Sequence, residues 1–134
     1  MDMDDDTREI LSIIEQFWRA LDALEADKAR ALTAPDMMII DAFAPFHWAG
    51  ANSFDRWVEA LWAYCTKHDF SMNHTTLRAP SRFTLVGDQA YVVCPAMMAT
   101  ARGDELMSQQ GVIVTTLRSD DGTWRITALV WAGQ

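Results

Sequence analysis

Residues 37–50 read MMIIDAFAPFHWAG and give the strongest indication of the architecture. The first four residues of this stretch are apolar and predict a short buried strand, and the aromatic-rich run from Asp41 to Gly50 predicts a loop. Ser53 follows as a natural N-cap for a helix whose apolar residues recur at helical spacing from Phe54 to Cys65. A strand, an aromatic loop and a capped helix are therefore expected in the middle of the chain.

Two helices are predicted before this strand. Asp6 and Glu9 form a capping-box-like pair ahead of apolar residues that recur every three or four positions from Ile10 to Leu24. A short second helix is predicted at residues 28–32, and Pro35 is expected to end it. Because one stripe of the long helix is apolar, that stripe should pack on the rest of the domain.

The second half of the chain is typical of strands. Turn signals rich in glycine and aspartate separate runs that alternate or are continuously apolar. The predicted strands are 70–86 with a break near Pro80, then 89–101, 105–118 and 123–132. The 134 residues suit one domain, 1–134, and the element order predicts an α+β fold of three helices on an antiparallel sheet.

The strand at 89–101 is apolar on both of its faces. One face carries Tyr91, Val93 and Met97, and the other carries Val92, Cys94 and Met98. A sheet with one solvated face would alternate more cleanly between apolar and polar residues. We therefore expect the outer sheet face to pack on a second copy of the chain, as a homodimer.

Composition narrows the classes of function. A formal net charge of −8 argues against a basic nucleic-acid surface, and no apolar run reaches the length of a membrane span. The acidic N-terminus is unlike a signal peptide, so a cytoplasmic location is expected. Cys65 and Cys94 are expected to be buried free thiols. Because no paired-histidine motif or glycine-rich phosphate loop occurs, no metal or cofactor is predicted.

The element order and the 37–50 stretch resemble the NTF2-like superfamily, which includes SnoaL-like and ketosteroid-isomerase-like proteins. The resemblance covers nearly the whole chain and implies a cone-shaped fold, with helices over a strongly bent sheet and an apolar pocket. In the isomerases a catalytic aspartate ends the same strand, so the resemblance implies that Asp41 is a general base. The two oxyanion donors of those enzymes fall on Phe17 and Val114, and neither side chain can donate a hydrogen bond.

Three polar residues are candidates for the chemistry of such a pocket. Asp41 lies in apolar sequence, which would raise its pKa toward that of a useful base; alternatively, it caps the loop through backbone amides. His47 could be an acid or a hydrogen-bond donor, or simply an exposed loop residue. His74 enters the pocket only if its strand turns that face inward.

The remaining candidates line the pocket. Aligning the last hairpin with the isomerases implies that Thr127 and Trp131 line it with Val114, while Phe17 and Trp62 form helix-side walls. Strict alternation places Thr127 and Trp131 on one face of the last strand. The alternative is that these rings fill the cone and leave no cavity.

These observations favour a protein that binds a small apolar molecule and carries out acid/base chemistry on it, of the isomerase, lyase or cyclase type. Two alternatives stay open, since one fold can serve many functions. The first is a ligand-binding module without catalysis. The second is a dimeric scaffold whose working surface is the outer sheet face.

Overall fold

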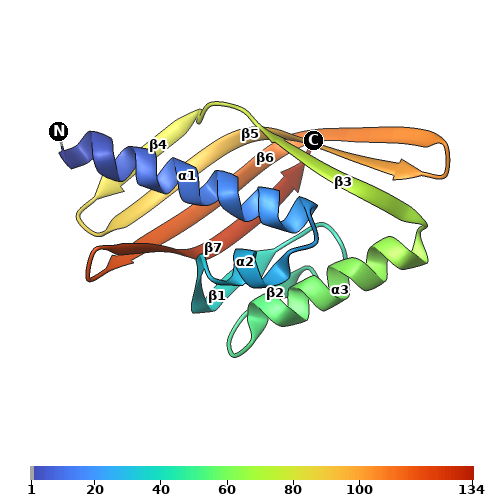
Figure 1. Ribbon diagram of the computed structural model, residues 1–134, viewed down its shortest axis with the longest axis horizontal. Coiled ribbons are helices and arrows are strands. Elements are labelled where there is room, and N and C mark those ends of the chain that lie inside the picture. The colour runs from blue at the N-terminus through green and yellow to red at the C-terminus, as the bar shows by residue number, and fades with distance from the viewer. Residues whose placement is uncertain (1) are drawn as a thin grey trace.

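The computed structural model describes residues 2–134, apart from the side chains of residues 2–4 and 72. Three helices and seven strands follow one another along the chain (Figure 1). The helices are α1 (Asp2–Asp22), α2 (Ala26–Arg30) and α3 (Ser53–Lys67). The strands are β1 (Thr33–Ile40), β2 (His47–Trp48), β3 (Phe70–Leu77), β4 (Arg82–Val86), β5 (Gln89–Arg102), β6 (Glu105–Asp120) and β7 (Thr123–Gly133).

Helix α1 begins at Asp2, four residues before the predicted cap at Asp6. Acidic residues are favourable near a helix N-terminus because they complement its dipole, so the acidic run continues the helix instead of capping it. Asp6 accepts a hydrogen bond from the indole N–H of Trp124, with 3.4 Å between Nε1 and Oδ1. The side chain predicted as a cap therefore contacts the last strand.

Helix α3 also begins differently from the prediction. Asn52 is its N-cap, with a left-handed φ of 59°, and Ser53 is its first helical residue. The buried Ser53 hydroxyl donates to the backbone carbonyl of Met37 at 2.5 Å. Ser53 therefore holds the start of α3 against β1 instead of capping the helix.

The sheet has the order β2-β1-β7-β6-β5-β3, and β4 also pairs with β5. All its pairs are antiparallel except β1 with β7, so the sheet is mixed where the sequence predicted an antiparallel one. Pro35 lies within β1, where the register with β7 shifts between Thr33 and Met38. A proline is tolerated there because the regular ladder of hydrogen bonds is interrupted.

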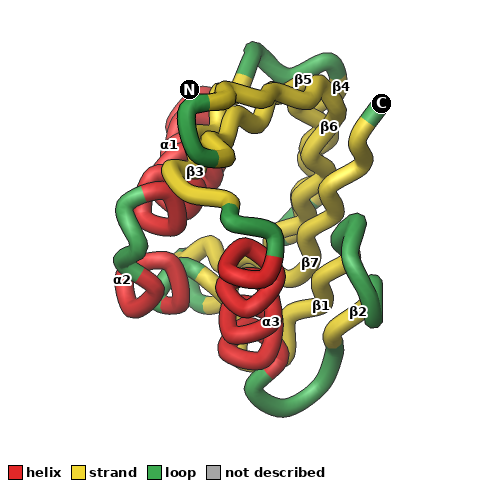
Figure 2. Tube along the Cα trace, turned by 90° about the vertical axis from the view of Figure 1, so that its right-hand side faces the viewer, coloured by secondary structure: helices red, strands yellow, loops and turns green. Residues whose placement is uncertain are grey.

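The sheet curls, and the three helices cover its concave side (Figure 2). From β1 it bends through β7, β6 and β5 to β3, which contacts α1. The core fills most of the space between the layers, with Phe17 of α1 fully buried beside Trp57 of α3. This is the α+β cone that the sequence predicted.

Two irregularities decide which side chains point inward. On β7, Ile126 pairs with Leu117 and Ala128 pairs with Thr116, so Thr127 is an extra residue that forms a bulge. On β3, the step from Ser71 to His74 lies opposite a shorter step from Ala101 to Ala99 on β5. Each extra residue reverses the alternation of side chains along the rest of its strand.

Gly111 of β6 lies where the sheet leaves no room for a side chain. A Cβ atom there would lie 2.8 Å from the Trp131 ring and 2.9 Å from the Gly133 Cα, and closer still to the Ala132 carbonyl oxygen. Gly111→Ala is expected to lower the free energy of unfolding by about 1–3 kcal/mol, because backbone atoms would have to move. Urea unfolding followed by tryptophan fluorescence measures this change.

Gly133→Ala is the matched control for this substitution. The three atoms nearest to an added Cβ there all belong to the side-chain amide of Gln109, which can rotate away. The expected change in the free energy of unfolding is within about 0.5 kcal/mol. Equal losses in the two variants would contradict the steric account of Gly111.

Candidate functional site

The helix layer and the sheet enclose a cavity of about 410 Å³. Its walls come from α1, α3, β3, β5, β6 and β7 and from the loop after β1. Six aromatic rings line it: Trp18, Phe43, Trp57, Tyr64, Phe70 and Trp131. The volume is in the range of small-molecule sites, and an apolar lining with few polar groups is typical of them.

Asp41 lies at the end of β1 and lines this cavity. Both oxygens of its carboxylate are held: Trp57 Nε1 donates to Oδ2 at 2.9 Å, and the Ala42 backbone N–H donates to Oδ1 at 2.7 Å. Burial raises the pKa of Asp41 above its ordinary value, although these two hydrogen bonds act in the opposite direction. The carboxyl group is thus oriented by α3 and made more basic by its surroundings.

Asp22, the last residue of α1, is a second carboxyl group in the same cavity. Its Oδ2 accepts from the Thr75 backbone N–H at 2.7 Å, and its Oδ1 accepts from the Thr75 hydroxyl at 3.0 Å. Burial raises the pKa of Asp22, while both hydrogen bonds from Thr75 and the nearby His74 lower it. The sequence analysis did not single out Asp22, although its position four residues after Trp18 on one helix face was a usable signal.

The raised pKa of Asp41 predicts how stability depends on pH. An acid with a raised pKa binds its proton more tightly in the folded state, so its ionisation lowers the free energy of unfolding as pH rises from its ordinary value of 3.8 through the raised pKa. Asp41→Asn removes this titration. Wild type is therefore expected to lose stability relative to Asp41→Asn between pH 4 and neutrality.

Melting temperatures of both proteins at several pH values measure the effect. Asp22→Asn is expected to act in the same direction, since burial also raises the pKa of Asp22. A stability difference between wild type and Asp41→Asn that is constant with pH, or a wild type that loses stability relative to Asp41→Asn on acidification, would contradict the prediction.

Two of the predicted site residues, Asp41 and Trp131, line the cavity together. Phe17 does not, because it is fully buried behind the cavity wall, where its ring stacks on Trp57 at 6.4 Å between centroids. Trp62 is 37% exposed on α3 and is not part of the lining. The rings from α3 that line the cavity are Trp57 and Tyr64, five residues before and two residues after Trp62.

The structure does not bring either predicted histidine into the cavity lining. His47 is exposed on β2, where it pairs with Ile40. His74 is exposed on β3, because the irregularity before it turns its neighbours Asn73 and Thr75 inward instead. The polar partner for Asp41 that the sequence analysis sought in a histidine is therefore absent from the described lining.

Thr127 and Val114 lie on the outer face of the sheet. The bulge at Thr127 breaks the alternation that was expected to place it beside Trp131, and its hydroxyl lies 2.8 Å from that of Thr116. Val114 lies between Ile113 and Thr115, whose side chains are buried on the inner face, so its own side chain points outward. Neither residue lines the cavity.

The two cysteines are both free. Cys94 is buried, as predicted, whereas Cys65 is only half-buried and lines the cavity beside Asn73. Within the described residues, no group of three or more histidine, cysteine and acidic side chains could hold a metal ion. The helices of the described part are all too short or too polar to cross a membrane.

Comparison with solved structures finds the same architecture at low sequence identity. A protein provisionally named as an NTF2-like dehydratase from Streptomyces avermitilis superposes with a TM-score of 0.81 and 14% identity, covering 98% of this chain and 97% of that one. An NTF2-like protein with a cystatin-like fold from Novosphingobium aromaticivorans gives 0.80 and 18%, covering 98% and 84%. An NTF2-like superfamily protein from Salmonella enterica serovar Typhimurium gives 0.76 and 18%, covering 94% and 89%.

Comparison by sequence points to the same family. A search of curated proteins gives no match to the chain. The model of the SnoaL-like domain family matches residues 10–130, which is nearly the whole sequence. The chain therefore belongs to the SnoaL-like domain family and has the NTF2-like fold.

Proposed function

We propose that the protein binds a small apolar molecule in the cavity and moves a proton on it, with Asp41 as the base. The observation that carries this proposal is the Asp41 carboxylate, which lines the cavity with both oxygens held in place by N–H donors. Burial makes this carboxylate a better base near neutral pH. Fixed orientation also keeps one lone pair of each oxygen available to a ligand.

The proposed step begins with ionised Asp41, which takes a proton from the carbon next to a carbonyl group of the ligand. Negative charge then develops on the carbonyl oxygen and needs hydrogen-bond donors. Phe17 and Val114 cannot supply them, but Tyr64, Asn73 and Gln109 carry donors and line the cavity. Return of the proton to another carbon gives isomerisation, and loss of a neighbouring hydroxyl group as water gives elimination.

The name of the similar Streptomyces protein, a dehydratase, agrees with such an elimination but belongs to that protein. The test for this chain is deuterium exchange in D₂O at the acidic carbon of a fused-ring ketone, for which we choose 2-tetralone. Protein-dependent exchange, followed by proton NMR and lost in Asp41→Asn, is the expected result. Exchange at the rate of buffer alone, with 2-tetralone bound, would contradict proton transfer.

A binding module without catalysis is the second candidate function. The observation that favours it is the lack of an oxyanion donor at both Phe17 and Val114, together with the absence of any histidine from the described cavity lining. On this account the cavity binds an apolar metabolite, and Asp41 only orients it. Binding without exchange in wild type would support this second function.

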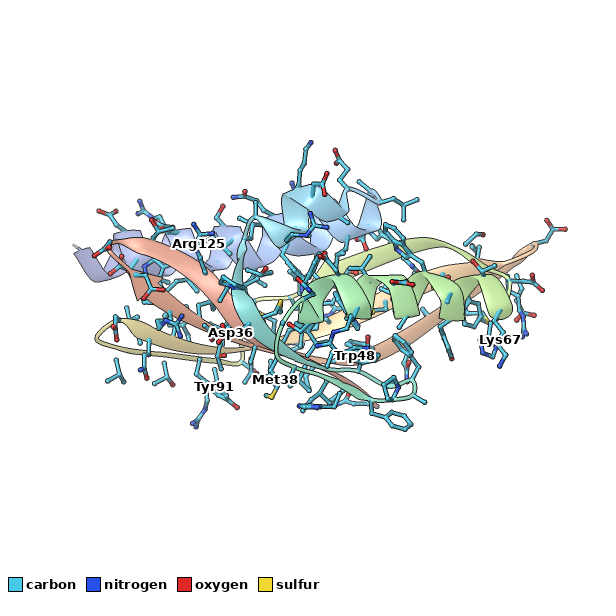
Figure 3. All side chains as sticks on the ribbon, turned by 90° about the horizontal axis from the view of Figure 1, so that it is seen from below. Asp36, Met38, Trp48, Lys67, Tyr91 and Arg125 are labelled. Atoms are coloured by element: carbon cyan, nitrogen blue, oxygen red, sulfur yellow. The ribbon has the colours of Figure 1, made fainter. Side chains whose placement is uncertain are left out.

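We also propose that the outer sheet face pairs two copies of the chain. Three apolar side chains of this face are partly exposed: Met38 by 37%, Ile40 by 38% and Tyr91 by 42%. Figure 3 shows Met38 and Tyr91 pointing away from the helices.

Analytical ultracentrifugation should give a dimer for wild type and a monomer for Met38→Lys, because a lysine buried in the dimer interface would lack a partner. Leu106→Lys, at an exposed hairpin tip, is the control and should remain dimeric. A monomeric wild type at micromolar concentration would contradict the dimer.

A further inference from the structure

The charges that line the cavity are all of one sign. Asp22 and Asp41 are the two carboxyl groups of the described lining, which contains no arginine, lysine or histidine. All six ion pairs in the described part of the chain are between exposed or half-exposed side chains, and none includes either aspartate. Both carboxyl groups are partly buried, and the nearby His74, which is exposed outside the lining, is the one positive neighbour that acts on Asp22. A partly buried carboxylate gains from a cation placed beside it, and the described lining supplies none.

The aromatic walls favour the same sign of ligand charge. The face of each ring carries negative electrostatic potential and attracts a cation, most strongly for tryptophan. Trp18 precedes Asp22 by four residues on α1, and both line the cavity, so an indole and a carboxylate share one stretch of wall. An anionic ligand would meet carboxylates and ring faces together, whereas a cation would be attracted by both.

Asp22 is better placed than Asp41 to bind a ligand cation. Its two oxygens are fixed by a single residue, Thr75, through a backbone N–H and a hydroxyl group. Each oxygen keeps a further lone pair for a ligand N–H. Asp41 accepts hydrogen bonds from Trp57 and Ala42, in a different part of the cavity wall. The proposed function already assigns Asp41 the role of base.

We propose that the ligand of this cavity carries a protonated amine, which pairs with Asp22 against Trp18 while its apolar rings lie among the aromatic walls. This inference rests on the proposed function, because it assigns the charge of the ligand on which Asp41 acts. It makes the cavity a site for ring-bearing organic cations, selective against carboxylates of the same shape.

The experiment compares three compounds that share one ring skeleton and differ in charge: 2-aminotetralin, 2-tetralol and 1,2,3,4-tetrahydro-2-naphthoate. Dissociation constants at pH 7 are measured by isothermal titration calorimetry with the full chain. The amine is expected to bind about tenfold or more tightly than the alcohol, and the carboxylate more weakly than the alcohol. Equal binding of amine and alcohol, tighter binding of the carboxylate, or no binding of any of the three would overturn the inference.

Variants then locate the cation. Asp22→Asn should remove the preference for the amine over 2-tetralol, while Asp36→Asn, the same charge change at an exposed residue of β1, should keep the preference. Asp22→Ser is the substitute if Asp22→Asn does not fold. The ranking of the three dissociation constants for the wild-type protein tests the charge preference without any variant. Loss of the preference in Asp41→Asn but not at residue 22 would overturn the assignment to Asp22.

The outcome is separable from the test of proton transfer. Deuterium exchange of 2-tetralone, a neutral ketone, depends on Asp41 and not on a cation. Exchange without a preference for the amine would leave Asp41 as base and overturn only the cation site. A preference for the amine without exchange would leave an amine-binding module.

Discussion

Asp41→Asn is expected to slow deuterium exchange of 2-tetralone by about 10²–10⁴-fold, the usual contribution of a positioned general base. Asparagine has nearly the same size as aspartate and can still accept one of the two N–H donors that hold residue 41. The affinity for 2-tetralone should therefore stay within about threefold of wild type, since a tenfold change would need about 1.4 kcal/mol. Proton NMR in D₂O gives the exchange rate, and titration calorimetry gives the affinity.

Trp57→Phe is the matched control for this variant. It keeps a ring in the wall but removes the N–H that donates to Asp41 Oδ2. Loss of one such hydrogen bond should slow exchange by about tenfold, much less than loss of the carboxylate. Exchange that is equally fast in wild type and Asp41→Asn would place the base elsewhere and contradict the role of Asp41.

Phe17→Ala is expected to lower the free energy of unfolding by about 3–5 kcal/mol. The ring is fully buried and meets three others, with centroid distances of 5.4 Å to Trp18, 6.0 Å to Phe54 and 6.4 Å to Trp57. Removing the ring loses the stabilisation that comes from burying it. It also leaves a void that the aromatic neighbours on two helices can fill only in part. Urea unfolding followed by far-UV circular dichroism measures the loss without relying on the tryptophans nearby.

Leu106→Ala provides the control, since Leu106 is 80% exposed at the tip of the β5–β6 hairpin. Its effect on the free energy of unfolding should stay within about 0.5 kcal/mol. A loss below about 1 kcal/mol in Phe17→Ala would contradict the core position of this ring. It would instead favour a ring at the edge of the cavity, as the sequence analysis expected.

Most elements of this fold could be predicted because they have local signals, although the two-residue strand β2 lies in the stretch 41–50 that was predicted as a loop. The apolar stripe from Ile10 to Leu24 predicts the first helix, and the apolar runs between glycine-containing turns predict the strands. Asp41 could be singled out because it directly follows a predicted strand. The parallel pairing of β1 with β7 could not be predicted in this way. It joins residues about ninety positions apart, such as Met38 and Ala128, and no local pattern indicates it.

The inner and outer positions of individual side chains were harder to predict, because they depend on single extra residues. Strict alternation of side chains along β7 would place Thr127 on the same face as Trp131. The extra residue of the bulge places Thr127 on the opposite face instead. The irregularity on β3 turns His74 outward in the same way. Asp22 was missed because a charged residue at the end of a helix usually lies in water.

The bulge at Thr127 also makes β7 tolerant of changes in length. Thr127 and Ala128 both project toward the outer face, so a chain lacking one of them would keep Ile126 and Leu129 on the inner face. Deletions elsewhere in the strand would exchange its faces and expel Trp131 from the cavity wall. Because bulges increase local twist and bending, the shortened strand would straighten. Evolution could therefore alter the curvature of the sheet, and with it the shape of the cavity, by gaining or losing one residue at this position.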